Sequence, residues 1–102
     1  MSDCFAAAKP TAHMKQLCEA LGPRYSIQMI DMEQVISRDF RNGYNVEVSG
    51  TNTASIKKLA TIYLWAGTQR IAKTLHDVPQ CEIGARVEEL NELTQEAGGK
   101  LL

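Results

Sequence analysis

The sequence predicts a two-layer α+β domain: a helix, an antiparallel meander of four or five strands, and a closing helix on the same sheet face. Three observations predict this fold. An apolar pattern of helical period ends at Gly22, and the stretch that follows alternates between apolar and polar side chains as strands do. Within that stretch, Asn42-Gly43 is a strong signal for a tight hairpin. After Pro79 the apolar period becomes helical again.

Length and charge set the outer limits. The 102 residues are enough for one domain with a modest core, and residues 1–10 are interpreted as a loosely ordered lead-in. Hydrophobic residues make up 44% of the chain and charged residues 23%, values that are ordinary for a globular domain. The net charge of −1 argues against a strongly basic nucleic-acid binder and against a uniformly acidic DNA mimic, so direct DNA binding is not expected.

Targeting and redox signals favour a cytoplasmic location. No apolar run approaches the roughly 18 residues of a membrane span, and the N-terminus lacks the basic start and long apolar core of a signal peptide. The three cysteines, Cys4, Cys18 and Cys81, are an odd number without C-x-x-C spacing. We therefore expect a reduced protein with no disulfide framework and no membrane association.

The first helix is predicted to run for about ten residues after Thr11, whose side chain is suited to the N-cap position. It ends where glycine at the C′ position and the proline after it cannot continue the helix. Its apolar stripe has the spacing i, i+3, i+4 and i+7: Met14, Leu17, Cys18 and Leu21. Because Cys18 lies inside this stripe, we interpret it as a small buried hydrophobe rather than a nucleophile.

A first strand is predicted over residues 24–31, with a helix over residues 26–35 as the alternative. The hairpin over residues 34–50 follows. A three-residue loop over residues 41–43 pairs Phe40 with Tyr44 and gives one coherent apolar face, whereas a two-residue loop mixes apolar and polar side chains. In the chosen register Arg38 lies on the apolar face, and the polar face carries Asp39, Asn45 and Glu47.

Two later strands are predicted over residues 56–66 and 69–78. In the first, the apolar residues at positions 60, 62 and 64 share one face, and Tyr63 and Trp65 share the other. In the second, an edge strand, Ile71 and Leu75 share a face with the stem of Lys73. The closing helix is predicted from a stripe that ends before Gly98-Gly99: Ile83, Val87, Leu90, Leu93 and Ala97.

No pattern of catalytic or metal-binding residues emerges from the sequence. It contains no P-loop, G-x-G-x-x-G or G-x-S-x-G motif. His13 and His76 are far apart in the chain and the cysteines add no ligand pair, so neither a metal nor a cofactor is expected. Asp39 and Glu47 stand diagonally on the polar face of the hairpin, which we interpret as a solvated surface. We predict no catalytic residue and no enzymatic activity.

Candidate residues for binding a partner come from three places. Arg38 is either a guanidinium that snorkels past the edge of the core or an anchor for an acidic group of a partner. Tyr63 and Trp65 are either interface hot spots on an exposed sheet face or residues covered by the helices or by a second copy of the chain. The closing helix contributes an acidic face that either steers a partner or promotes solubility: Glu88, Glu89 and Glu92.

The run VEVSGTNTASIKKL over residues 46–59 resembles a region of a small type II-A anti-CRISPR protein, a phage-encoded inhibitor of the Cas9 nuclease. This run is about a seventh of the chain, and the matching positions in it are Val46, Ser49, Gly50, Thr51, Ser55, Ile56 and Leu59. The resemblance implies a compact sheet packed with helices that occupies the DNA-binding surface of Cas9 with acidic groups. This chain lacks the strong acidity of that protein. The run YNVEVSG also looks like small proteins of bacterial mobile elements.

We therefore expect a small non-enzymatic binding protein, and its most concrete form is a phage or mobile-element inhibitor of a bacterial defence nuclease. Such an inhibitor acts by steric occlusion on Cas9 or on the Cas9–guide RNA complex, as the resemblance implies. The alternative is a structural or regulatory homodimer that uses its sheet face. A small enzyme is the third class, and it requires a deep pocket with converging polar groups.

Overall fold

A computed structural model describes residues 11–30, 33–51 and 59–96, and it confirms the predicted fold class. The predicted lead-in over residues 1–10 lies outside this range. The elements follow the predicted order of a helix, a five-stranded meander and a helix: α2 (Ala12–Leu21), β1 (Ser26–Ile30), β2 (Glu33–Asp39), β3 (Tyr44–Ser49), β4 (Ala60–Ala66), β5 (Arg70–Val78), the 3₁₀ turn η1 (Gln80–Glu82) and α3 (Ile83–Glu96).

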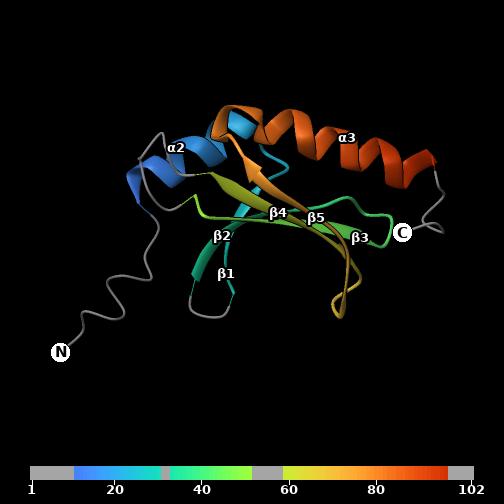
Figure 1. The fold of residues 1–102 in the computed structure, drawn as a ribbon. Coiled ribbons are helices and arrows are strands. Elements are labelled where there is room, and N and C mark those ends of the chain that lie inside the picture. Colours follow the sequence, from blue (N-terminus) through green and yellow to red (C-terminus); the bar gives the residue numbers. More distant parts are fainter. Residues whose placement is uncertain (1–10, 31–32, 52–58, 97–102) are drawn as a thin grey trace.

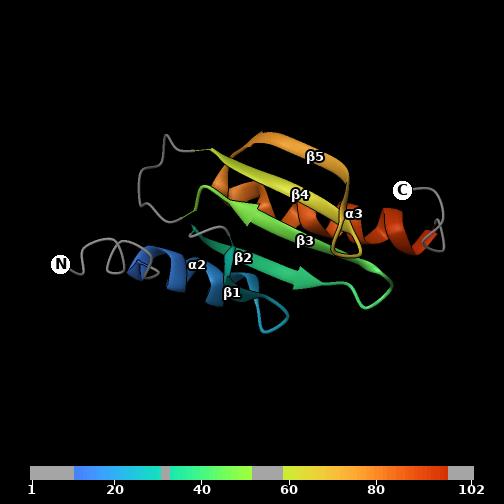
Figure 2. The same ribbon diagram turned by 90° about the horizontal axis from the view of Figure 1, so that it is seen from below.

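The molecule has two layers, with both helices on one face of the sheet (Figure 1). Neighbouring strands are antiparallel and follow one another in the order β1-β2-β3-β4-β5. Seen from the side away from the helices, β3 runs through the middle of an uncovered sheet face (Figure 2). In Figure 1, β1 and β2 on one side and the β4–β5 turn on the other bend away from the helix layer.

The core lies between the sheet and the helices because strand residues of one parity are apolar. Val46, Val48, Ile62 and Leu64 are fully buried on this face. They belong to one cluster with Met14 of α2 and with the apolar stripe of α3: Ile83, Val87 and Leu90. Burying each of these large side chains contributes roughly 1.5–3 kcal/mol, so this one-sided packing is the main stabilising term.

The β2–β3 hairpin has the predicted register. Ile36 pairs with Val48, and the amide of Phe40 donates to the carbonyl of Tyr44 at 3.0 Å. Gly43 has φ 93°, the left-handed conformation that the bulge of a three-residue loop requires, and Arg41, with φ 62°, is a second left-handed residue in this loop. Asparagine suits the position between them because its Oδ1 accepts from the amide of Tyr44 at 3.1 Å.

Strands β1, β4 and β5 are compared with the strands predicted from the sequence. Of the strand predicted over residues 24–31, β1 covers Ser26–Ile30, so the alternative of a helix from residue 26 is wrong there, and residue 31 lies outside the described range. The strand predicted over residues 56–66 begins at Ala60: Leu59 lies before it, and residues 56–58 are outside the described range. The prediction that Ile71 and Leu75 share a face of the sheet is wrong. Ile71 pairs with Trp65 and Leu75 with Ile62, because register shifts between β4 and β5 change the alternation.

The closing helix forms as predicted after a 3₁₀ turn, although Ala97 and Gly98-Gly99 lie outside the described residues. Gly84 lies in the first turn of α3. A Cβ at this position meets Leu21 Cδ2 of α2 at 3.4 Å, which is ordinary van der Waals contact with a flexible side chain. The near neighbour of Gly84 is therefore the other helix.

Two glycine substitutions test this account of the backbone. Gly43→Ala is expected to destabilise the fold by about 1 kcal/mol because an L side chain strains the left-handed conformation. Gly84→Ala, its matched control, is expected to stabilise the fold by about 0.5 kcal/mol because alanine is the better helix former. Urea denaturation measures both free energies of unfolding, and equal destabilisation by the two variants would contradict the account.

Candidate functional site

The face of the sheet turned away from the helices carries the two predicted aromatic residues. Ile62 and Leu64 are fully buried toward the helices, so Tyr63 and Trp65 project from the other side of β4, where they are half-buried. Cross-strand pairing sets Tyr63 beside Glu47 and Trp65 beside Asn45 and Ile71. This settles which side of the sheet the helices cover.

The sheet is curved so strongly that both of its edge strands line the same hollow. A hollow of about 430 Å³ is lined by Ile30 of β1 and by Ile71 of β5, the first and last strands. A second hollow of about 240 Å³ shares Ile30, Glu47 and Trp65 with it. We call this surface the concave face and define it by six residues: Ile30, Glu33, Glu47, Tyr63, Trp65 and Ile71.

The concave face carries both apolar and acidic side chains. Ile30 is 36% exposed and Ile71 is 44% exposed, although both are large aliphatic residues. The indole N–H of Trp65 donates to Glu47 Oε1 at 3.2 Å, which orients the ring and leaves its polar edge satisfied. The described residues that line the two hollows include two glutamates but neither lysine nor arginine. This surface therefore suits a cationic group that stacks on an aromatic ring.

Arg38 lies on the opposite side of the sheet, inside the protein. Its side chain is 4% exposed, so it does not snorkel into solvent. Nη1 donates to Glu88 Oε2 of α3 at 2.5 Å and to the Tyr25 hydroxyl at 3.3 Å. The guanidinium carbon stands 5.4 Å from the ring centre of Tyr25 and 5.2 Å from that of Phe40. Arg38 thus connects β2, the start of β1 and α3.

The contact between Arg38 and Glu88 shifts the pKa values of both residues. Burial alone would lower the pKa of Arg38, but its hydrogen bonds to Glu88 and Tyr25 raise it above the ordinary value. The hydrogen bond from Arg38 lowers the pKa of Glu88 below its ordinary value of 4.5, against a smaller effect of burial. Both groups are therefore charged at neutral pH.

The six predicted partner-binding residues do not form one site. Tyr63 and Trp65 belong to the concave face, whereas Arg38 and Glu88 contact each other on the helix side. Glu89 is exposed on α3 and accepts from Arg86 Nη1 at 2.7 Å, and Glu92 is exposed near the end of the same helix. The acidic helix face and the aromatic sheet face are thus separate surfaces.

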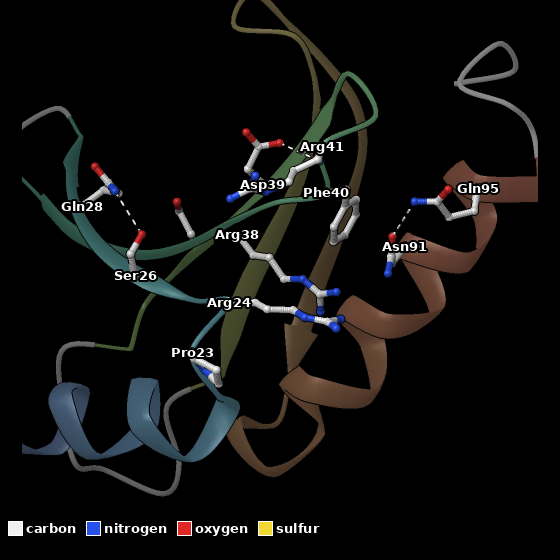
Figure 3. A pocket seen from close by; sticks show the side chains of 11 residues that line it. Pro23, Arg24, Ser26, Gln28, Arg38, Asp39, Phe40, Arg41, Asn91 and Gln95 are labelled. Atoms are coloured by element: carbon white, nitrogen blue, oxygen red, sulfur yellow. Dashed lines mark hydrogen bonds between the residues drawn. The ribbon is translucent and has the colours of Figure 1, made fainter.

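A cleft of about 690 Å³, which the sequence does not predict, lies next to the Arg38–Glu88 pair (Figure 3). Its walls come from the start of β1, the end of β2 and the second half of α3. Three arginines line it, Arg24, Arg38 and Arg41, with the amides of Asn91 and Gln95. Among the lining residues, the sequence marked only Arg38, by its position on the apolar face of its strand. The lining residues of α3 are far from it along the chain, so the sequence does not show that they lie close together.

Other chemistry is sparse over residues 11–30, 33–51 and 59–96. Within these ranges no group of three metal-ligating side chains comes together. Cys18 is half-buried against the core and Cys81 is exposed, while Cys4 lies outside the described residues. None of the helices described is both long enough and apolar enough to cross a membrane.

Comparison of the chain with family models, curated proteins and solved structures finds no match. Of the stretch that resembles an anti-CRISPR protein, Val46 and Thr51 are fully buried, and residues 52–58 lie outside the described range.

The Arg38–Glu88 pair predicts a pH dependence of stability. The folded state lowers the pKa of Glu88, so its contribution is present above pH 4.5 and is lost as the pH falls through the lower, folded pKa. Glu88→Gln is expected to destabilise the protein by about 1 kcal/mol at pH 7, a modest value because Glu88 is half exposed.

The measurement is urea denaturation of both proteins at pH 7 and at pH 3. The difference between them is expected to shrink at pH 3, because this pH is below the ordinary pKa of 4.5 and folding must there compete with protonation of Glu88 in the unfolded chain. The exposed variant Glu92→Gln is the control, with little effect at either pH. A Glu88→Gln deficit that is the same at both values would argue against the pair.

Proposed function

We propose that this protein is a small, non-enzymatic binding protein that holds a basic segment of a protein partner on its concave face. By occupying that segment it blocks the partner sterically. The observation that carries the proposal is the combination of exposed apolar and aromatic groups with two carboxylates on one curved surface. Aromatic residues concentrate binding energy at protein interfaces, and carboxylates select cationic side chains.

The geometry favours a protein segment over a small ligand. The two hollows adjoin through shared residues, so they form one continuous surface that spans the sheet from β1 to β5. Trp65 is already oriented by Glu47, which reduces the entropy lost on binding. A lysine or arginine laid across the Trp65 ring gains both the cation–π contact and attraction to Glu33 and Glu47.

The most concrete partner class is a nucleic-acid-binding protein of a bacterial defence system, such as the Cas9–guide RNA complex. Proteins of this kind present lysine and arginine side chains to phosphates. The net charge of −1 does not oppose this proposal, because the acidic groups are concentrated locally on the face that would meet the partner. The resemblance over residues 46–59 supports the same class.

Charge reversal at two glutamates separates the concave face from the acidic helix. Glu33→Lys is expected to weaken binding to the Cas9–guide RNA complex by at least about tenfold, since it repels a cationic segment. Glu92→Lys makes the same change on α3 and is expected to stay within about twofold of wild type. Surface plasmon resonance at fixed salt concentration measures both affinities.

The aromatic residues are tested with a matched apolar control. The double variant Tyr63→Ala, Trp65→Ala is expected to lose measurable binding, whereas Met29→Ala, an exposed apolar residue outside the hollows, retains it. If Glu92→Lys abolishes binding and Glu33→Lys does not, the acidic helix is the interface and the proposal fails. Absence of wild-type binding overturns the Cas9 version, and a dimer in sedimentation that Trp65→Ala dissociates supports the homodimer instead.

A further inference from the structure

The cleft beside the Arg38–Glu88 pair lies on the helix side of the sheet and has no part in the binding proposed for the concave face. We propose that this cleft, which we call the arginine cleft, binds the phosphate group of a small organic ligand. Six residues carry the argument: Arg24, Arg38, Phe40, Arg41, Asn91 and Gln95.

The first support is the incomplete hydrogen bonding of a buried guanidinium. A guanidinium has five N–H donors. Both hydrogen bonds that the Arg38 side chain makes to described residues leave from Nη1, toward Glu88 and Tyr25. Nε and Nη2 donate to none of the residues that the structure describes, although the side chain is 4% exposed and borders the cleft. Neither atom is among the fully buried unpaired atoms of the described residues, so both are accessible to an acceptor bound in the cleft.

The second support is an excess of positive charge. Arg24 and Arg41 also line the cleft, and neither side chain forms an ion pair with an acid in the described part of the chain. Asp39 borders the cleft too and accepts from the backbone amide of Arg41 at 2.8 Å, so the lining residues include three arginines and one acid. In the view of Figure 3 the side chains of Arg24 and Arg38 both extend toward α3.

The chemistry of these groups selects a phosphate. Guanidinium forks bind phosphate oxygens in a bidentate manner, and a dianion offsets the charge of several arginines in one cleft better than a single carboxylate does. The amides of Asn91 and Gln95, one turn apart on α3, add polar groups along the opposite wall. The volume of about 690 Å³ falls within the usual range of small-molecule sites.

A long polyanion fits this cleft poorly. Glu88 stands at its edge with a half-exposed carboxylate, and the exposed Glu89 and Glu92 follow on the same helix. These charges repel a nucleic-acid backbone that extends along α3, whereas a compact ligand avoids them. The proposal is therefore limited to a small phosphorylated molecule.

The test uses two probes, inorganic phosphate and ribose 5-phosphate, titrated into the ¹⁵N-labelled full chain at constant ionic strength. Both are expected to give saturable shifts at the amides of Arg24, Arg38, Arg41 and Asn91. Ribose 5-phosphate is expected to bind at least about threefold more tightly, because the sugar adds contacts to the walls. Equal affinities would show that free phosphate alone is recognised and would overturn the organic ligand.

Two arginine variants separate a site from general electrostatic attraction. Arg24→Gln is expected to weaken ribose 5-phosphate binding by at least about tenfold, since Arg24 lines the cleft. Arg86→Gln removes the same charge from a half-exposed position of α3 outside the cleft and is expected to change the affinity less than about twofold. Equal weakening by both variants would overturn the proposal.

Glu88→Gln provides a change in the other direction. Its carboxylate repels an incoming anion, so its removal is expected to strengthen ribose 5-phosphate binding by about threefold or more in the fraction that remains folded. Circular dichroism confirms that the variant is folded before the titration. Unchanged or weaker binding by a folded Glu88→Gln variant would contradict the proposed position of the phosphate.

Discussion

The register of the β2–β3 hairpin is the constraint on which the rest of the structure depends. The left-handed conformation of Gly43 allows the bulge of a three-residue loop, and this register determines the face on which each side chain of the two strands lies. This parity directs Arg38 toward α3 and Glu47 toward the uncovered face. A slip of one residue would exchange the two and bury a carboxylate among the apolar residues of the core.

The same one-sided packing produces both candidate sites. The helices cover one face and bury its aliphatic residues, which leaves Tyr63 and Trp65 on the other side. Where α3 passes the end of β2, the core gives way to polar groups, and Arg38 lies at this transition. The molecule therefore presents an acidic aromatic surface on one side of the sheet and a cationic cleft on the other, so a protein partner and a small anion would not compete directly.

Local signals were enough to predict the fold class, the hairpin register and the alternation in β4, because Asn42-Gly43 and the apolar parity act over a few residues. Ile71 lies on the same face as Trp65 because of register shifts between β4 and β5, which alternation alone does not predict. The pairing of Arg38 with Glu88 and the arginine cleft join elements far apart in the chain, and only the tertiary fold places them together. The parity of Arg38 marked it as unusual without identifying its partner.

Trp65 offers the most direct test of the central claim, that the protein partner occupies the concave face. It is the one tryptophan of the chain, so biosynthetic labelling with 5-fluorotryptophan gives a single ¹⁹F resonance that an unlabelled partner does not obscure. Saturation with the Cas9–guide RNA complex, or with another basic protein that the chain captures, is expected to shift this resonance and to protect it from a soluble paramagnetic agent. Saturable binding that leaves both the shift and the paramagnetic relaxation of Trp65 unchanged would contradict the account.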